Sequence, residues 1–97
     1  MKLRFLDPAG VELAEATFYY EGQLAGLGIL FEQEVRAALD RIRQYPDAWH
    51  PLSRRTRICR LKRFPYGVIY QTRPEEILIV AIAHQHRRPE YWKERLL

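Results

Sequence analysis

The sequence is poor in cysteine and has no long apolar run. Its one cysteine, Cys59, excludes an internal disulfide and a thiolate-rich zinc site, and its place in an apparent strand predicts a core residue. No stretch approaches the roughly 20 apolar residues of a membrane span, and residues 1–5 lack the apolar character of a signal peptide. We therefore expect a cytoplasmic protein that has no membrane partner.

The length and composition predict one folded domain over residues 1–97. The 97 residues suffice for one core and are too few for two. A hydrophobic fraction of 47% with 29% charged residues is that of an ordinary globular protein, so disorder is not expected.

Charge is divided unevenly along the chain. Residues 1–47 hold five Lys/Arg against eight Asp/Glu, whereas residues 48–89 hold nine Lys/Arg against two Glu. The separation predicts one basic surface, the usual footprint for binding an anion, an RNA or an acidic protein, although a generic solvated surface gives the same count.

Two stretches repeat apolar residues at steps of three and four, the spacing of one helix face. The first follows a short strand over residues 2–6 and comprises Ala9, Leu13, Ala16, Tyr20 and Leu24. The second comprises Phe31, Val35, Ala38, Ile42 and Tyr45. Glu12, Glu15 and Glu21 fall outside the first apolar face. The pattern predicts an antiparallel helical hairpin that needs a sheet to cover it.

The C-terminal half predicts that sheet. Residues 57–64, 68–70 and 77–83 have the composition of strands, and the continuous apolar run at 77–83 is expected to be the central one. Pro89 can open a short final helix through Leu96. The expected fold is α+β, in the order βααβββα: an N-terminal strand and helical hairpin packed on a small twisted antiparallel sheet, followed by a short C-terminal helix.

Several short segments occur in a characteristic order along the chain. They are Phe18-Tyr19-Tyr20-Glu21, Leu27-Gly28, Tyr45-Pro46 with Trp49, Arg63-Phe64-Pro65-Tyr66 with Val68-Ile69-Tyr70, and the stretch from His84 to Trp92. Together with the element order, they resemble the RelE/ParE superfamily of toxins from bacterial type II toxin–antitoxin modules. The resemblance implies a toxin neutralised by a cognate antitoxin. ParE-like members inhibit DNA gyrase, and RelE-like members cut messenger RNA on the ribosome.

The resemblance also identifies the positions where RelE-like ribonucleases carry catalytic residues. These are Lys and Arg on the middle strands, two further Arg and a C-terminal Tyr. The corresponding positions here are approximately Ile58, Arg60, Gly67, His86 and Trp92. Because most of the reactive side chains are absent, we favour a ParE-like gyrase inhibitor.

Two other interpretations stay open. A ribosome-dependent, metal-independent endoribonuclease would use His84 and His86 to exchange protons and Arg60 to hold phosphate. A third possibility is a relative that has lost toxicity and persists as a partner of the antitoxin. The candidate target- or phosphate-binding residues are Arg60, Lys62, Arg63, Arg87, Arg88, Tyr66, Tyr91 and Trp92.

Each candidate also has a structural explanation. The Phe64–Gly67 stretch can be a turn, the histidines can cap or pack, and Tyr91 and Trp92 can pack a final helix on the core. His84 and His86 lack a nearby third ligand, so no metal and no other cofactor is expected.

Overall fold

The computed structural model describes all residues, 1–97. Its two helices follow the first strand, and the other four strands come after them. They are β1 (Lys2–Phe5), α1 (Asp7–Gln23), α2 (Leu27–Gln44), β2 (His50–Pro51), β3 (Thr56–Arg60), β4 (Tyr66–Thr72), β5 (Glu76–His84) and a 3₁₀ turn, η1 (Lys93–Leu96). The expected α+β order is confirmed, with the two-residue β2 as an addition. No helix is long and apolar enough to cross a membrane.

The five strands form one sheet in the order β1-β5-β4-β3-β2. β1 runs parallel to β5 and the other pairings are antiparallel, so the sheet is mixed. The chain between the parallel strands β1 and β5 contains the helical hairpin and the other three strands. The apolar run 77–83 lies in β5, between β1 and β4. The expectation that this run is the central strand was wrong. β4 is the middle strand of the five, because β3 and β2 lie on one side of it and β5 and β1 lie on the other.

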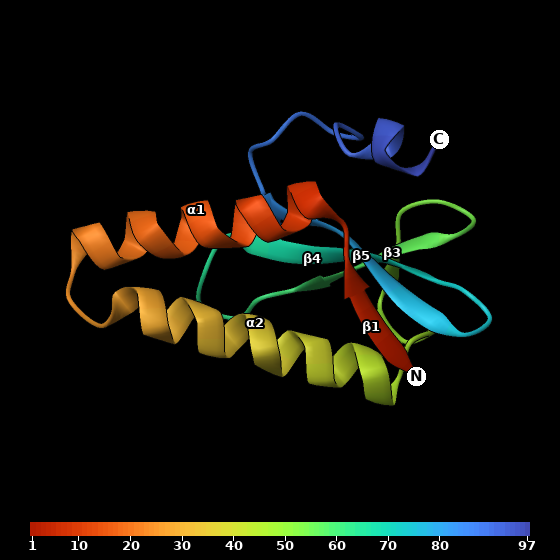
Figure 1. The fold of residues 1–97 in the computed structure, drawn as a ribbon, viewed down its shortest axis with the longest axis horizontal. Coiled ribbons are helices and arrows are strands. Elements are labelled where there is room, and N and C mark those ends of the chain that lie inside the picture. The colour runs from red at the N-terminus through yellow and green to blue at the C-terminus, as the bar shows by residue number, and fades with distance from the viewer.

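Each face of the sheet is covered by a different part of the chain. α1 and α2 pack on one face, and the segment after β5 runs beside the sheet in Figure 1. Ile77, Ile79 and Ile82 of β5 belong to the core beneath the helices. The core of the other face includes Val80 of β5 and Trp92 of the C-terminal segment. Coverage on both faces explains why β5 reads as a continuous apolar run.

The connection between α1 and α2 is tight (Figure 1). Gly26 has a φ of 90°, in the left-handed region that glycine favours. A Cβ on Gly28 would lie 2.7 Å from the carbonyl oxygen of Thr17, so the two helices approach as closely as glycine permits. Glu21 accepts hydrogen bonds from the amides of Gly26, at 2.9 Å, and Gly28, at 3.0 Å. Its carboxylate therefore satisfies amide groups at the start of α2.

The C-terminal segment departs from the predicted helix. Residues 85–92 form turns, and only Lys93–Leu96 are helical, as a single 3₁₀ turn. Glu90 has a φ of 66°, which interrupts helical geometry. Side-chain anchors instead determine the path of this segment, since Trp92 is buried in the core.

Candidate functional site

A cavity of about 420 Å³ opens between the sheet and the C-terminal segment. Strands β3, β4 and β5 form its base, and residues 85–92 form one wall. Apolar side chains of Ile58, Ile69, Ala83 and Trp92 line it, together with the basic side chains of Arg60, Arg87 and Arg88. This combination of an apolar floor and a cationic rim suits a ligand or partner with apolar and anionic groups.

Most of the residues expected from the sequence meet at this cavity. Those that line it are Arg60, Tyr66, His84, Arg87, Arg88, Tyr91 and Trp92. Three others do not line it: Lys62, Arg63 and His86. Sequence reasoning missed the apolar floor, because alternation within β3 and β4 does not reveal which face a cavity will occupy.

Lys62 and Arg63 lie outside the cavity because Glu34 of α2 holds their turn. The Glu34 carboxylate accepts hydrogen bonds from the amides of Lys62, at 2.8 Å, and Arg63, at 2.9 Å, and it pairs with the Arg63 guanidinium at 2.6 Å. Burial raises the pKa of Glu34, but the hydrogen bonds from Arg63 and Lys62 outweigh that effect and the net pKa is lowered. Arg63 is thereby committed to a structural ion pair.

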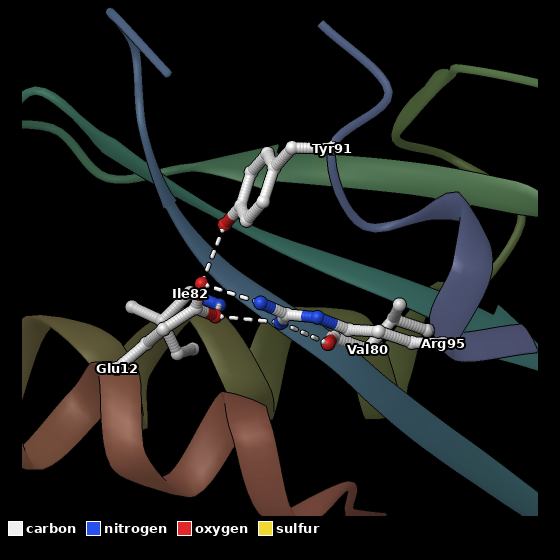
Figure 2. Close-up of polar contacts among 5 residues, drawn as sticks. All are labelled: Glu12, Val80, Ile82, Tyr91 and Arg95. Carbon is white, nitrogen blue, oxygen red and sulfur yellow. Dashed lines mark hydrogen bonds and ion pairs between the residues drawn. The ribbon is translucent and has the colours of Figure 1, made fainter. Parts of the chain in front are cut away.

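Glu12 of α1 anchors the wall of the cavity, as Figure 2 shows. Its carboxylate accepts hydrogen bonds from the Tyr91 hydroxyl, at 2.8 Å, and from two guanidinium nitrogens of Arg95, both at 2.9 Å. Burial raises the pKa of Glu12, yet these hydrogen bonds prevail and the net pKa is lowered. Glu12 lay outside the predicted apolar face, but it points toward the C-terminal segment that flanks α1 rather than into solvent.

Glu12 and Arg95 also bind backbone groups at an edge of the sheet that has no strand partner. β1 pairs with β5 only as far as Phe5 opposite Ile79, so β5 has no strand partner on that side beyond this point. The Ile82 amide donates to Glu12 at 3.0 Å, and the Val80 carbonyl accepts from Arg95 at 2.9 Å (Figure 2). Two side chains therefore satisfy backbone groups that an exposed edge would leave open.

Tyr91 is held from both ends. Its hydroxyl donates to Glu12, and the Arg87 guanidinium carbon lies 3.9 Å from the centre of its ring. Burial, followed by the hydrogen bond to Glu12, raises the pKa of Tyr91 far above its ordinary value. Tyr91 is therefore neutral at physiological pH, and it positions Arg87 at the rim by a cation–π contact.

His84 and Tyr66 form an aromatic pair at the mouth of the cavity. Their rings meet edge to face with centres 5.0 Å apart. The His84 Nδ1 atom accepts a hydrogen bond from the His86 amide at 3.0 Å, and the two imidazole rings are 5.3 Å apart. The Nδ1 atom of His84 is thus occupied by a backbone contact. Burial raises the pKa of Tyr66, which keeps its hydroxyl neutral.

Gly67 lies where β3 and β4 leave no room for a side chain. A Cβ on Gly67 would lie 2.5 Å from Cδ1 and 2.7 Å from Cγ1 of Ile58. Any larger residue would force Ile58 to move from the cavity floor. Trp92, at the other position that the resemblance singled out, is only 5% exposed and packs in the core. Neither position presents a reactive group to the cavity.

No three His, Cys, Asp or Glu residues come together in an arrangement that could hold a metal ion. The cavity offers guanidinium groups, an imidazole, two phenols and apolar surface, together with the carboxylate of Glu90. These groups bind anions, aromatic rings and apolar side chains.

A family model assigns this chain, with its helical hairpin on a small mixed sheet and its basic cavity beside residues 85–92, to the class of small toxins of type II toxin–antitoxin modules. The family model described as "ParE toxin of type II toxin-antitoxin system, parDE" matches residues 3–89. The chain belongs to the ParE toxin family.

The fold has a counterpart among solved structures. One of them, described as "Chromosomal ParDE TA system from P. aeruginosa", aligns with a TM-score of 0.62 and 17% sequence identity, covering 87% of this chain and 95% of that one. At this identity the likeness concerns the fold. No curated protein sequence matches the chain significantly.

Proposed function

We propose that this chain inhibits DNA gyrase as the toxin of a type II module and is neutralised by a cognate antitoxin. Membership of the ParE toxin family supports the toxin role. The observation that carries the choice of target is that the cavity is lined by groups suited to binding. Gly67 brings no side chain, Trp92 is buried, and the Nδ1 atom of His84 is already engaged.

The proposed antitoxin partner is a segment with apolar and acidic side chains. The apolar floor at Ile58 and Ile69 would take the apolar side chains, and Arg60, Arg87 and Arg88 at the rim would pair with the carboxylates. Masking these arginines would keep them from the target, which links neutralisation to the same surface that acts on gyrase. A solved relative described as a ParDE toxin–antitoxin system is consistent with such a partner.

A second candidate function is RelE-like cleavage of messenger RNA. It is favoured by the presence of His84 beside Arg60, Arg87 and Arg88 in one cavity, which brings a proton-transfer group next to phosphate-binding groups. Against it, His86 does not line the cavity, so the expected pair of histidines is not convergent there.

The two functions separate in parallel assays on the same protein. Purified chain is added to gyrase in a DNA supercoiling assay, and messenger RNA cuts are mapped after expression of the chain in cells. The gyrase proposal predicts loss of supercoiling without new cuts. Codon-periodic cuts that disappear with His84→Ala would establish the ribonuclease instead.

Silence in both assays would favour a relative that binds an antitoxin but has lost toxicity. Co-expression with the product of a neighbouring small acidic reading frame then tests the partner alone. A stable complex would support the proposed pairing of this chain with an antitoxin. Failure to form a complex would contradict the antitoxin part of the proposal.

A further inference from the structure

A second basic cavity lies at the other end of the same strands. It has a volume of about 600 Å³ and is lined by Asp47, Arg54, Arg55, Arg57, Tyr70, Gln71, Thr72, Arg73, Pro74 and Leu96. None of these residues lines the first cavity. The two cavities adjoin in the middle of the strands, since Ile69 of β4 lines the first and Tyr70, the next residue, lines the second.

The cavity lies between two turns of the sheet. The β2–β3 turn carries Arg54 and Arg55, and the β4–β5 turn carries Arg73. Both turns are at the end of the sheet remote from the connection between α1 and α2 (Figure 1). The cavity is therefore remote from the connection between the two helices, and Asp47 lines it just beyond the C-terminal end of α2.

Four arginines face a single aspartate in this cavity. None of the ion pairs in the structure involves Arg54, Arg55 or Arg57. Arg73 approaches Glu76 at 3.8 Å, but that carboxylate already makes two hydrogen bonds to Arg4. The cavity consequently holds an excess of guanidinium charge without matching carboxylates.

Two of the four arginines are held in place before any ligand arrives, and the backbone turn that bears the other two is closed. Arg57 donates to the Trp49 carbonyl at 2.8 Å, and the Nε of Arg73 donates to the Gln71 side-chain oxygen at 2.8 Å. In the turn that bears Arg54 and Arg55, the Ser53 and Thr56 hydroxyls share a hydrogen bond at 2.6 Å, and the Ser53 hydroxyl oxygen accepts one from the Thr56 amide at 3.2 Å. Each fixed guanidinium keeps further N–H groups for a ligand, and preorganisation lowers the cost of binding.

We propose that this second cavity binds the phosphodiester backbone of a nucleic acid. Only Tyr70, Pro74 and Leu96 among the lining residues carry apolar surface, and Tyr70 is fully buried, so the cavity lacks the anchors that a protein segment would need. Guanidinium groups match phosphate oxygens in geometry and charge, and phosphate contacts position a protein without reading sequence. The site would hold the toxin against the nucleic acid of its target complex while the first cavity engages the target itself. The phosphate site does not depend on the identity of that target.

The test is binding of fluorescein-labelled DNA and RNA oligonucleotides to the purified chain, followed by anisotropy between about 50 and 200 mM salt. The double variant R54A/R55A is compared with R36A/R43A, which removes the same charge from exposed positions on α2. We expect R54A/R55A to weaken binding and to lower the slope of log K against log salt by about 1.5, the value for two lost phosphate contacts. R36A/R43A should keep the slope of the original chain, and both variants should keep its unfolding midpoint.

Equal slopes for the two variants would overturn the proposal, because binding would then follow net charge alone. Loss of binding by DNA but not RNA, or the reverse, would support it and identify the kind of nucleic acid. Binding of poly-glutamate that depends on Arg54 and Arg55, without oligonucleotide binding, would overturn it in favour of an acidic protein segment. Inhibition of gyrase is measured separately, so failure of this site and failure of the proposed function are distinguishable.

Discussion

The Glu12 carboxylate accepts four hydrogen bonds, one more than that of Glu34. It joins α1, the edge of β5 and the C-terminal segment through one carboxylate (Figure 2). The spacing of apolar residues placed Glu12 on a polar face of the helix. That spacing shows only which side of α1 packs on the sheet. A second cover, arriving from the far end of the chain, cannot be inferred from the local pattern.

Replacement of this carboxylate by an amide should destabilise the protein. Glu12→Gln leaves the Arg95 guanidinium, whose side chain is largely buried, without a counter-charge. We expect a loss of about 1–3 kcal/mol in the free energy of unfolding, measured by urea denaturation. Glu15→Gln, at an exposed position one helical turn away, is the matched control and should change it by less than about 0.5 kcal/mol. Equal effects of the two variants would contradict the role of Glu12.

The lowered pKa values of Glu12 and Glu34 predict acid sensitivity. Both carboxyls titrate below their usual value of 4.5 when folded, so the unfolded chain binds protons more readily than the folded one. Their contribution to stability is present above pH 4.5 and is lost as pH falls through the lowered folded values. Urea denaturation across this range should show stability falling with pH. The double variant E12Q/E34Q should show a shallower fall, and an unchanged pH dependence in that variant would contradict the assignment.

Among the elements, the two helices could be predicted from the spacing of apolar residues. The pairing of β1 at one edge of the sheet could not. Phe31, Val35, Ala38 and Ile42 of α2 are all buried, as their steps of three and four predicted. The parallel pairing of β1 with β5 joins residues more than seventy positions apart, and no local pattern encodes it. The path of residues 85–92 likewise depends on distant anchors.

The close approach of α1 and α2 gives a test at the hairpin. Gly28→Ala would place a Cβ against the backbone carbonyl of Thr17, which cannot rotate away. We expect a loss of about 1–3 kcal/mol in the free energy of unfolding by chemical denaturation. Gly10→Ala, in α1 with nothing near its added Cβ, should instead gain about 0.5–1 kcal/mol. A gain at both positions would show that the helices have room to separate.

The C-terminal segment is a second element whose packing can be tested. Trp92 covers the sheet face opposite the helices, next to Ile69 and Val80. Trp92→Ala should cost about 3–5 kcal/mol in the free energy of unfolding and open the wall of the first cavity. Tyr45→Ala removes an aromatic ring that is 63% exposed and should cost far less. Similar losses for the two variants would contradict the packing of Trp92.

At the scale of the whole molecule, the uneven charge of the chain becomes two basic cavities at opposite ends of β3 and β4. The sequence predicted a basic surface and brought seven of its candidate residues to the first cavity: Arg60, Tyr66, His84, Arg87, Arg88, Tyr91 and Trp92. The sequence did not predict the second cavity. Arg54, Arg55 and Arg57 line the same cavity as Arg73 only because β3 pairs with β4.

We propose above that this ParE family chain acts on gyrase, and the rim of the first cavity is the surface through which it would bind. The most direct measurement is inhibition of gyrase supercoiling by the purified chain, by R87A/R88A and by R36A/R43A as the charge-matched control. We expect inhibition by the original chain and by the control, and a loss of potency of about tenfold, equivalent to about 1.4 kcal/mol, in R87A/R88A. Full supercoiling in the presence of the folded original chain would contradict it.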